Sequence, residues 1–234
     1  MSPLSRAIAI LAVVGLFFGC SSDDNNNTPT PDVTVIDDLG TPDGTTINYP
    51  AGPFGTDKGD VIANMQFFGF KDPNTYCKLE KDLSLDVTQK VPMSFADFHN
   101  RVCDGSGKLA KPKQLLWVMV SAGWCGPCIQ EIRELGKIID SGGIDERVAF
   151  VDILFENDDH KPATEDFAKK WADTLGLKFP LLLDPTFQMG AYFDRQAVPF
   201  NMLVDLDTMQ VYFSITGAAF ATLGQQVQAF FANK

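Results

Sequence analysis

The chain has 234 residues, 45% of them hydrophobic, and its 30 acidic against 19 basic residues give a formal net charge of −11. This length fits one large domain or two small ones, and the apolar content suffices for one sizeable core. The acidic balance argues against nucleic-acid binding, because phosphate contacts need Lys and Arg. We interpret the negative net charge as a property that keeps the protein soluble.

An apolar stretch of signal-peptide length, residues 7–18, follows Arg6 at the N-terminus. It is too short to span a bilayer, which needs about 20 apolar residues. Gly19 and Cys20 come next, and this arrangement resembles a bacterial lipoprotein signal, in which the small residue permits cleavage and Cys20 receives the lipid. The pattern departs from that signal at Phe17, where Leu is usual. An ordinary secretory signal with an incidental Cys20 is the alternative.

Both interpretations of the N-terminus place the protein outside the cytoplasm. We expect a lipid-anchored protein of the bacterial cell envelope, and Ser21 favours the outer over the inner membrane by resemblance to Gram-negative sorting rules. Residues 1–19 are the expected signal peptide. Residues 20–48 are rich in Asp, Asn and Pro without Lys or Arg, which predicts a disordered linker.

The remainder divides into an N-terminal elaboration packed on the core (49–112) and a main domain (113–234). Continuous apolar runs in the main domain predict buried strands, and apolar residues at helical spacing predict amphipathic helices. The expected strands are 114–120, 147–155, 179–184, 200–205 and 210–215, the last two forming a hairpin. The expected helices follow Cys128, end at Gly176, and close the chain from Phe220 to Phe230. This alternation predicts an α/β sheet covered on both sides.

In the elaboration we expect short strands around residues 67–76 and a short helix over 94–102.

Two cysteines separated only by Gly126 and Pro127 lie where a buried strand passes into a helix. A helix N-terminus stabilises the thiolate that makes a cysteine reactive, which favours Cys125 as a nucleophile. Cys128 is one helical turn further on, where its sulfur can close a small disulfide. Pro127 suits the first turn because its missing N–H is not needed there. Gly126 leaves the outer sulfur open, and Trp124 supplies a flat apolar wall.

The segment WCGPC between strand and helix resembles the active-site motif of the thioredoxin superfamily. The chain from about 114 to 234 resembles the extracytoplasmic redoxins of the TlpA/ResA kind. The stretch AVPFNMLVD (197–205) resembles the family's second motif, which implies that Pro199 is cis and that Val198 presents its backbone to a substrate cysteine. Residues 162–183 match the redoxin insertion. The resemblance therefore implies a thioredoxin fold, a central mixed sheet flanked by helices, with an irregular N-terminal extension.

Two departures concern proton transfer. Cytoplasmic thioredoxins carry a buried Asp six residues before the first cysteine, and Met119 stands there, which puts an internal base at that position in doubt. The TlpA/ResA branch often has Glu three residues after the second cysteine, and Glu131 stands there. Glu131 is either a proton-handling group or a solvent-facing helix residue. Glu156, after a strand, is a weaker candidate for the same role.

Other functions of the CGPC pair fit less well. Structural zinc sites need two such pairs or added His, and the chain has two His and no second CxxC. A purely structural disulfide disagrees with the strand-to-helix context. Peroxiredoxins share the fold but resemble one another in a Thr three residues before the reactive cysteine, where this chain has Ala122. We expect no cofactor and no metal.

Cys77 and Cys103 remain, and in an oxidising compartment an even remainder suggests a disulfide. His99 and Cys103 are four residues apart on a probable helix, so with Cys77 they form an incomplete metal-ligand set. We interpret His160 as a solvated loop residue, with copper binding of the Sco kind as the alternative.

The sequence thus predicts a lipid-anchored thiol–disulfide oxidoreductase. Its partners would be protein disulfides or dithiols and a second redox protein that recharges Cys125 and Cys128. The Gly-Pro pair is associated with reducing members of the family, although the direction of electron flow stays open. The alternative is a partner-binding or chaperone-like lipoprotein on the same fold, with residues 49–112 as its docking surface.

Overall fold

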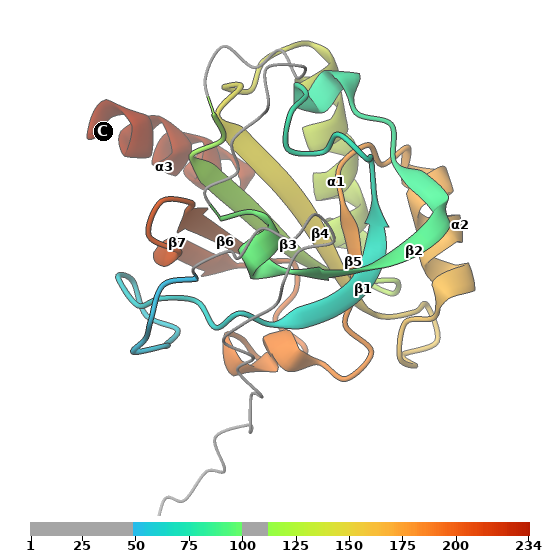
Figure 1. Cartoon of the computed structure of the whole chain (residues 1–234). Helices are drawn as coiled ribbons and strands as arrows, with labels where there is room; N and C mark the ends of the chain where they lie inside the picture. The colour runs from blue at the N-terminus through green and yellow to red at the C-terminus, as the bar shows by residue number, and fades with distance from the viewer. Residues whose placement is uncertain (1–48, 100–111) are drawn as a thin grey trace, which may run out of the picture. The chain divides into compact units, whose positions relative to one another are not determined.

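The computed structural model describes residues 49–99 and 112–234. These residues form a seven-stranded mixed sheet with the strand order β2-β1-β5-β4-β3-β6-β7 and three α-helices (Figure 1). The strands are β1 (Gln66–Lys71), β2 (Asp86–Ser94), β3 (Leu115–Ala122), β4 (Val148–Glu156), β5 (Leu181–Leu183), β6 (Phe200–Asp205) and β7 (Gln210–Thr216). The helices are α1 (Gly126–Asp140), α2 (Glu165–Leu175) and α3 (Phe220–Ala232).

The centre of the sheet is the parallel pair β3 and β4, and every residue of both strands is buried. Such strands have helices or loops on both faces, which explains their continuous apolar runs. β6 adds to β3 in antiparallel orientation and continues into a hairpin with β7. The strands predicted over 114–120, 147–155, 179–184, 200–205 and 210–215 are therefore confirmed, with small shifts at their ends.

The helices begin and end where local chemistry predicts. α2 starts after Thr164, whose Oγ1 accepts a hydrogen bond from the Phe167 N–H at 3.3 Å. It ends at Gly176, whose φ of 62° is the left-handed conformation that glycine tolerates. The three predicted helices are confirmed.

The N-terminal segment contributes two strands to the same sheet. β1 pairs antiparallel with β5 through Phe68 and Leu183, and β2 pairs with β1 (Figure 1). The helix predicted over 94–102 is observed as a single 3-10 turn, Phe95–Asp97, while residues 100–102 lie outside the described residues. The turn is held by reciprocal capping between Ser94 and Asp97, with the Ser94 N–H donating to Asp97 Oδ2 at 2.7 Å.

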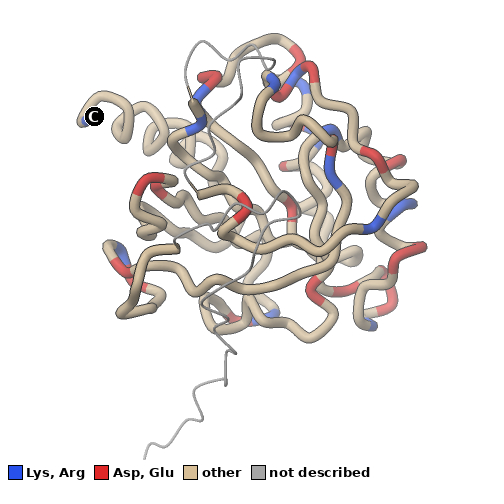
Figure 2. The backbone as a smooth tube through the Cα atoms, in the orientation of Figure 1, with Lys and Arg blue, Asp and Glu red and all other residues tan. Residues whose placement is uncertain are grey.

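The two faces of the sheet are covered differently. All three α-helices pack on one face, where their apolar residues join Trp117 and Met119 of β3 in one core cluster. The other face is covered by apolar residues of the N-terminal segment, together with Met189 and Met209. Figure 2 shows that charged residues are sparse along the central strands, and β3 contains none. Among the described residues, no helix has the length and apolar character needed to cross a membrane.

Candidate active site

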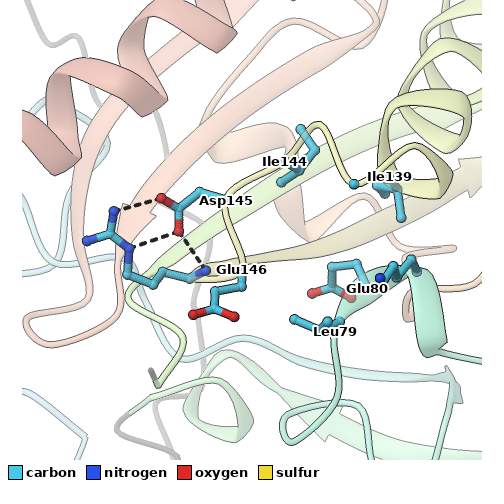
Figure 3. A pocket seen from close by; sticks show the side chains of 9 residues that line it. Leu79, Glu80, Ile139, Ile144, Asp145 and Glu146 are labelled. Carbon is cyan, nitrogen blue, oxygen red and sulfur yellow. Dashed lines mark hydrogen bonds and ion pairs between the residues drawn. The ribbon is translucent and has the colours of Figure 1, made fainter. Parts of the chain in front are cut away.

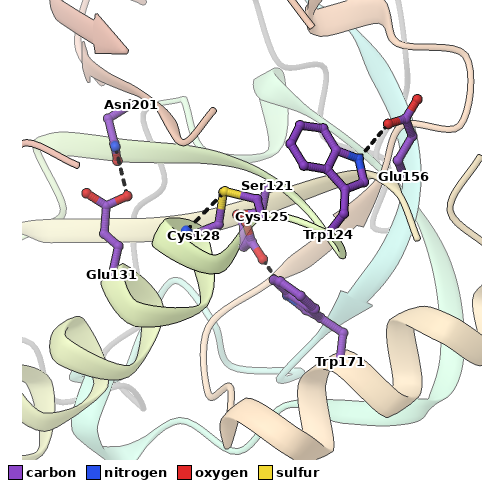
Figure 4. The surroundings of a disulfide bond; sticks show 9 residues. Ser121, Trp124, Cys125, Cys128, Glu131, Glu156, Trp171 and Asn201 are labelled. Carbon is purple, nitrogen blue, oxygen red and sulfur yellow. Dashed lines mark hydrogen bonds between the residues drawn. A yellow bond between two sulfur atoms is a disulfide. The ribbon is translucent and has the colours of Figure 1, made fainter. Parts of the chain in front are cut away.

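The two cysteines of the CGPC segment lie at the N-terminus of α1, directly beyond the end of β3 (Figure 4). They form a disulfide, with 5.3 Å between their Cα atoms. Cys125 is the N-cap of the helix, and its Sγ accepts a hydrogen bond from the Cys128 N–H at 3.1 Å. The Cys128 N–H in the first turn of the helix therefore points at the sulfur of Cys125, where the helix N-terminus stabilises negative charge.

Both sulfurs are buried in this disulfide form. Cys125 is 2% exposed and Cys128 is fully buried, because both belong to the core cluster against which Trp124 and Val198 pack. The expectation that Gly126 leaves the outer sulfur open is therefore wrong for this form, although Gly126 and Pro127 are themselves exposed.

The loop before β6 contains the second predicted motif. The Val198–Pro199 peptide bond is cis, which is the configuration that the resemblance implies. The carbonyl oxygen of Pro199 accepts a hydrogen bond from the Gly217 N–H at 2.7 Å, which ties the loop to the end of β7. Among the described residues, the backbone of Val198 has no hydrogen-bond partner.

Glu131 lies inside the protein, so the solvent-facing alternative is wrong. Its side chain projects from α1 and is 3% exposed. Oε2 accepts a hydrogen bond from Asn201 Nδ2 at 2.9 Å, while Oε1 is buried without a partner (Figure 4). Burial, and then the charges of Asp152 and Glu134, raise the pKa of Glu131 to about 7 against the hydrogen bond from Asn201. A carboxyl group in this state can exchange a proton near neutral pH.

A second buried carboxyl group was missed by the sequence analysis. Asp152 lies in the middle of β4, directly across the ladder from Met119, and is fully buried. Its oxygens accept hydrogen bonds from Ser121 Oγ at 2.7 Å and from Trp171 Nε1 at 2.9 Å. Burial raises the pKa of Asp152 to about 6, although both hydrogen bonds favour the ionised form. A lone Asp within the apolar run RVAFVDILF is the signal that could have identified it, because such a group must find partners.

Glu156 holds the tryptophan of the motif in place. Its Oε2 accepts a hydrogen bond from Trp124 Nε1 at 2.7 Å (Figure 4). Its Oε1 pairs with Arg195 of the loop that leads to Pro199. The His160 ring stacks on Trp124 with 4.8 Å between ring centroids, and its side chain is 60% exposed. Glu156 therefore joins the Trp124 segment to the loop before β6.

The other predicted residues lie away from this centre or outside the described ranges. Cys77 is disulfide-bonded, while Cys103 and Cys20 lie outside the described residues. His99 is buried, and its Nδ1 lies 2.8 Å from the Leu206 carbonyl oxygen. In the part of the chain that the structure describes, no group of three His, Cys, Asp or Glu residues is placed to hold a metal ion.

Two pockets lie at the opposite end of α1 from the cysteines. One, of about 390 Å³, is lined by Leu79, Glu80, Ile139 and Ile144 among others (Figure 3). Lys113 Nζ lies 3.0 Å from Glu80 Oε1 there, as a buried ion pair. The other pocket, of about 800 Å³, lies between α3 and the loop after α1. Neither is lined by Cys125 or Cys128.

The chain matches no protein-family model and no curated protein sequence. It is similar to the crystal structure of AhpC from Enterococcus faecalis, with 13% identity and a TM-score of 0.51, over 77% of this chain and 96% of that one. A DsbF homologue from Corynebacterium diphtheriae is 14% identical over 82% of this chain and 98% of its own, with a TM-score of 0.48. A secreted thiol-disulfide isomerase from Corynebacterium glutamicum is 14% identical over 82% of this chain and 97% of its own, with a TM-score of 0.46.

The chain has the thioredoxin fold. The succession β3-α1-β4, followed by the hairpin β6-β7 and helix α3, with β3 between β4 and β6, is the arrangement that defines this fold. The similarity to AhpC agrees with it. The fold class predicted from the sequence is thereby confirmed, and the cysteines occupy the N-terminus of its first helix.

Proposed function

We propose that this protein is a thiol–disulfide oxidoreductase that exchanges electrons with disulfides of partner proteins through Cys125 and Cys128. The observation that carries the proposal is the position of Cys125 as the N-cap of α1, where its sulfur accepts the Cys128 N–H. Helix N–H groups that stabilise a thiolate there make it a better nucleophile and leaving group at neutral pH.

In the first step the Cys125 thiolate attacks one sulfur of the partner disulfide. The partner S–S bond breaks, a mixed disulfide forms, and the departing partner thiolate takes up a proton. The Cys128 thiol then loses its proton to a base and attacks Cys125 Sγ. The second partner sulfur leaves, and the Cys125–Cys128 disulfide remains. The structure describes the protein in this oxidised form.

The loop before β6 supports a role in holding the partner chain. The backbone of Val198 has no hydrogen-bond partner among the described residues, so it can pair with an extended segment of a partner. Trp124 packs against the same core cluster as Val198, and we assign the proton of Cys128 to Glu131, which is buried on α1 three residues further along. Because Cys125 is 2% exposed, the partner or a local movement must uncover its sulfur.

The finer assignments rest on the sequence. The protein acts as a reductase, is recharged by a second redox protein, and is anchored to the envelope by a lipid on Cys20, with the outer membrane favoured over the inner. Cys77 pairs with Cys103 in a structural disulfide. Labelling with radioactive palmitate tests the anchor, because Cys20→Ser must abolish incorporation. Peptide mapping under non-reducing conditions tests the Cys77–Cys103 bond.

The central test is insulin reduction with dithiothreitol as electron donor, comparing the protein with its Cys125→Ser and Cys128→Ser variants. Cys125→Ser must abolish the activity, whereas Cys128→Ser must trap a mixed disulfide on Cys125. Full activity of Cys125→Ser would sink the proposal. The reduction potential decides direction: about −270 mV indicates a reductant, and about −120 mV an oxidant.

A further inference from the structure

Asp152 is a buried carboxyl group to which the exchange reaction above assigns no role. It is 0% exposed in the centre of β4, and each of its oxygens has a donor from a different element. Ser121 Oγ of β3 donates to Oδ1, and Trp171 Nε1 of α2 donates to Oδ2. Two such bonds hold the carboxyl group in one position and make its burial tolerable.

The register of the sheet relates Asp152 to the strand that leads into the dithiol. Its ladder partner Met119 is six residues before Cys125, and its hydrogen-bond donor Ser121 is four residues before it. Met119 faces the side of the sheet that α1 and α2 cover. Figure 4 draws Ser121 and Trp171 among the residues that surround the Cys125–Cys128 disulfide. Asp152 therefore lies on the strand next to the position where cytoplasmic thioredoxins keep their buried Asp.

Asp152 also interacts with Glu131. Met119 of β3 lies between Asp152 of β4 and Asn201 of β6 in the sheet, and Asn201 Nδ2 donates a hydrogen bond to Glu131 Oε2 at 2.9 Å. The negative charge of Asp152 raises the pKa of Glu131, whose Oε1 has no hydrogen-bond partner. The negative charge of Glu134 raises the pKa of Glu131 as well. Within the described residues no salt bridge reaches either buried carboxyl group. Ionising both groups together is therefore unfavourable, and such a pair titrates as a unit.

We propose that Asp152 is a positioning residue for the dithiol. Asp152 and Glu131 form a buried carboxyl pair that retains one proton. This pair sets the pH at which Cys128 is deprotonated. This inference rests on the proposed function. In the resolving step, the Cys128 thiol gives its proton to the ionised Glu131 carboxylate. The Cys128 thiolate then forms the bond to Cys125 Sγ, and the electron pair of the broken S–S bond leaves with the partner sulfur, which takes a proton from solvent. Asp152 acts through Glu131 and touches no reacting atom.

The resolving step can be measured by itself with 5,5′-dithiobis(2-nitrobenzoate) and the reduced protein. Attack by Cys125 releases a first thionitrobenzoate, and displacement by Cys128 releases the second. The rate of the second release, followed from about pH 5 to about pH 9, gives the midpoint of Cys128 deprotonation. Asp152→Asn keeps an oxygen that accepts from Trp171 and removes the charge, so we expect the midpoint to fall by about one pH unit.

The matched control is Asp173→Asn, the same change at an exposed position of α2, which must leave the midpoint unchanged. In a Glu131→Gln background, Asp152→Asn must have no further effect, because its influence passes through Glu131. If Asp152→Asn does not fold, Trp171→Phe provides the test. Losing the indole donor favours the protonated form of Asp152, so this variant must lower the midpoint as well, by less.

The outcomes separate the two proposals. If the wild type releases both equivalents of thionitrobenzoate and folded Asp152→Asn has the same midpoint of Cys128 deprotonation, the role of Asp152 is wrong. The proposed oxidoreductase function is unaffected by that result. A wild-type protein that releases no thionitrobenzoate overturns the proposed function, and the role of Asp152 with it.

Discussion

Replacing Glu131 with Gln changes the ionisation of one buried group while keeping its shape. The Gln carbonyl oxygen can accept the hydrogen bond that Asn201 Nδ2 now donates to Glu131 Oε2 at 2.9 Å. The new amide NH₂ takes the place of Oε1, which has no hydrogen-bond partner. A change in the pH dependence of stability would therefore report the lost carboxyl group.

The size and sign of the effect follow from the pKa of Glu131. Burial is the largest cause that raises this pKa from its ordinary 4.5 to about 7 in the folded protein. Between these values the folded state keeps a proton that the unfolded state has lost, so the free energy of unfolding falls as the pH rises. Below about pH 4.5 Glu131 is protonated in both states, and its ionisation does not lower the free energy of unfolding. Above about pH 7 it is ionised in both states, and at about 1.4 kcal/mol per pKa unit the free energy of unfolding is lower by about 3 kcal/mol.

Urea unfolding of the oxidised protein at about pH 5 and about pH 8 measures this difference. We expect the wild type to lose up to about 3 kcal/mol more than Glu131→Gln between the two conditions. Glu134→Gln is the matched control, an exposed Glu one turn along the same helix. Its charge is the smallest of the causes that raise the pKa of Glu131, so this variant should keep most of the pH dependence of the wild type. Equal pH dependence in the wild type and Glu131→Gln would refute the reasoning, because it would mean that Glu131 ionises in the folded state as it does in water.

Three further changes test other parts of the structure. Lys113→Met leaves the Glu80 carboxylate buried without its cation, so urea unfolding at about pH 8 should show a loss of about 3–5 kcal/mol, and no loss would contradict a buried pair. Gly176→Ala places a side chain at a φ of 62° and should cost about 1 kcal/mol, whereas a neutral result would mean that α2 ends differently. Glu156→Ala removes the acceptor of the Trp124 indole and should increase quenching of its fluorescence by acrylamide, while Glu156→Gln keeps an acceptor and should not.

The main elements of the fold could be predicted because their signals are local. A strand buried on both faces must be apolar at nearly every position, and LLWVMVSA meets that condition in β3. The end of α2 is marked by the glycine that its C-cap needs. The position of Cys125 at the start of α1 likewise follows from adjacent residues, since Pro127 fits only the first turn.

The place of the N-terminal strands could not be predicted, because it depends on contacts between distant parts of the chain. Phe68 of β1 lies opposite Leu183 of β5, and no local pattern indicates that pairing. The burial of Cys125 was missed for the same reason, since Val198, far along the chain, packs against its cluster. Turn chemistry near a cysteine indicates how the backbone bends there, and says nothing of which distant segment covers the sulfur.

Asp152 shows that a buried carboxyl group near the dithiol need not come from a fixed number of residues before the first cysteine. Searching for the internal acid six residues before Cys125 finds Met119, which suggests that the site lacks one. A parallel ladder, however, places the neighbouring strand's residue beside that position, and the register of β3 and β4 sets Asp152 there. Ser121 is a polar residue within an apolar strand, as Asp152 is, and two such residues on adjacent strands are best explained by their hydrogen bond to one another. In the role proposed for Asp152, the dithiol needs a carboxyl group on the side of the sheet that α1 covers, and β3 or β4 can supply it.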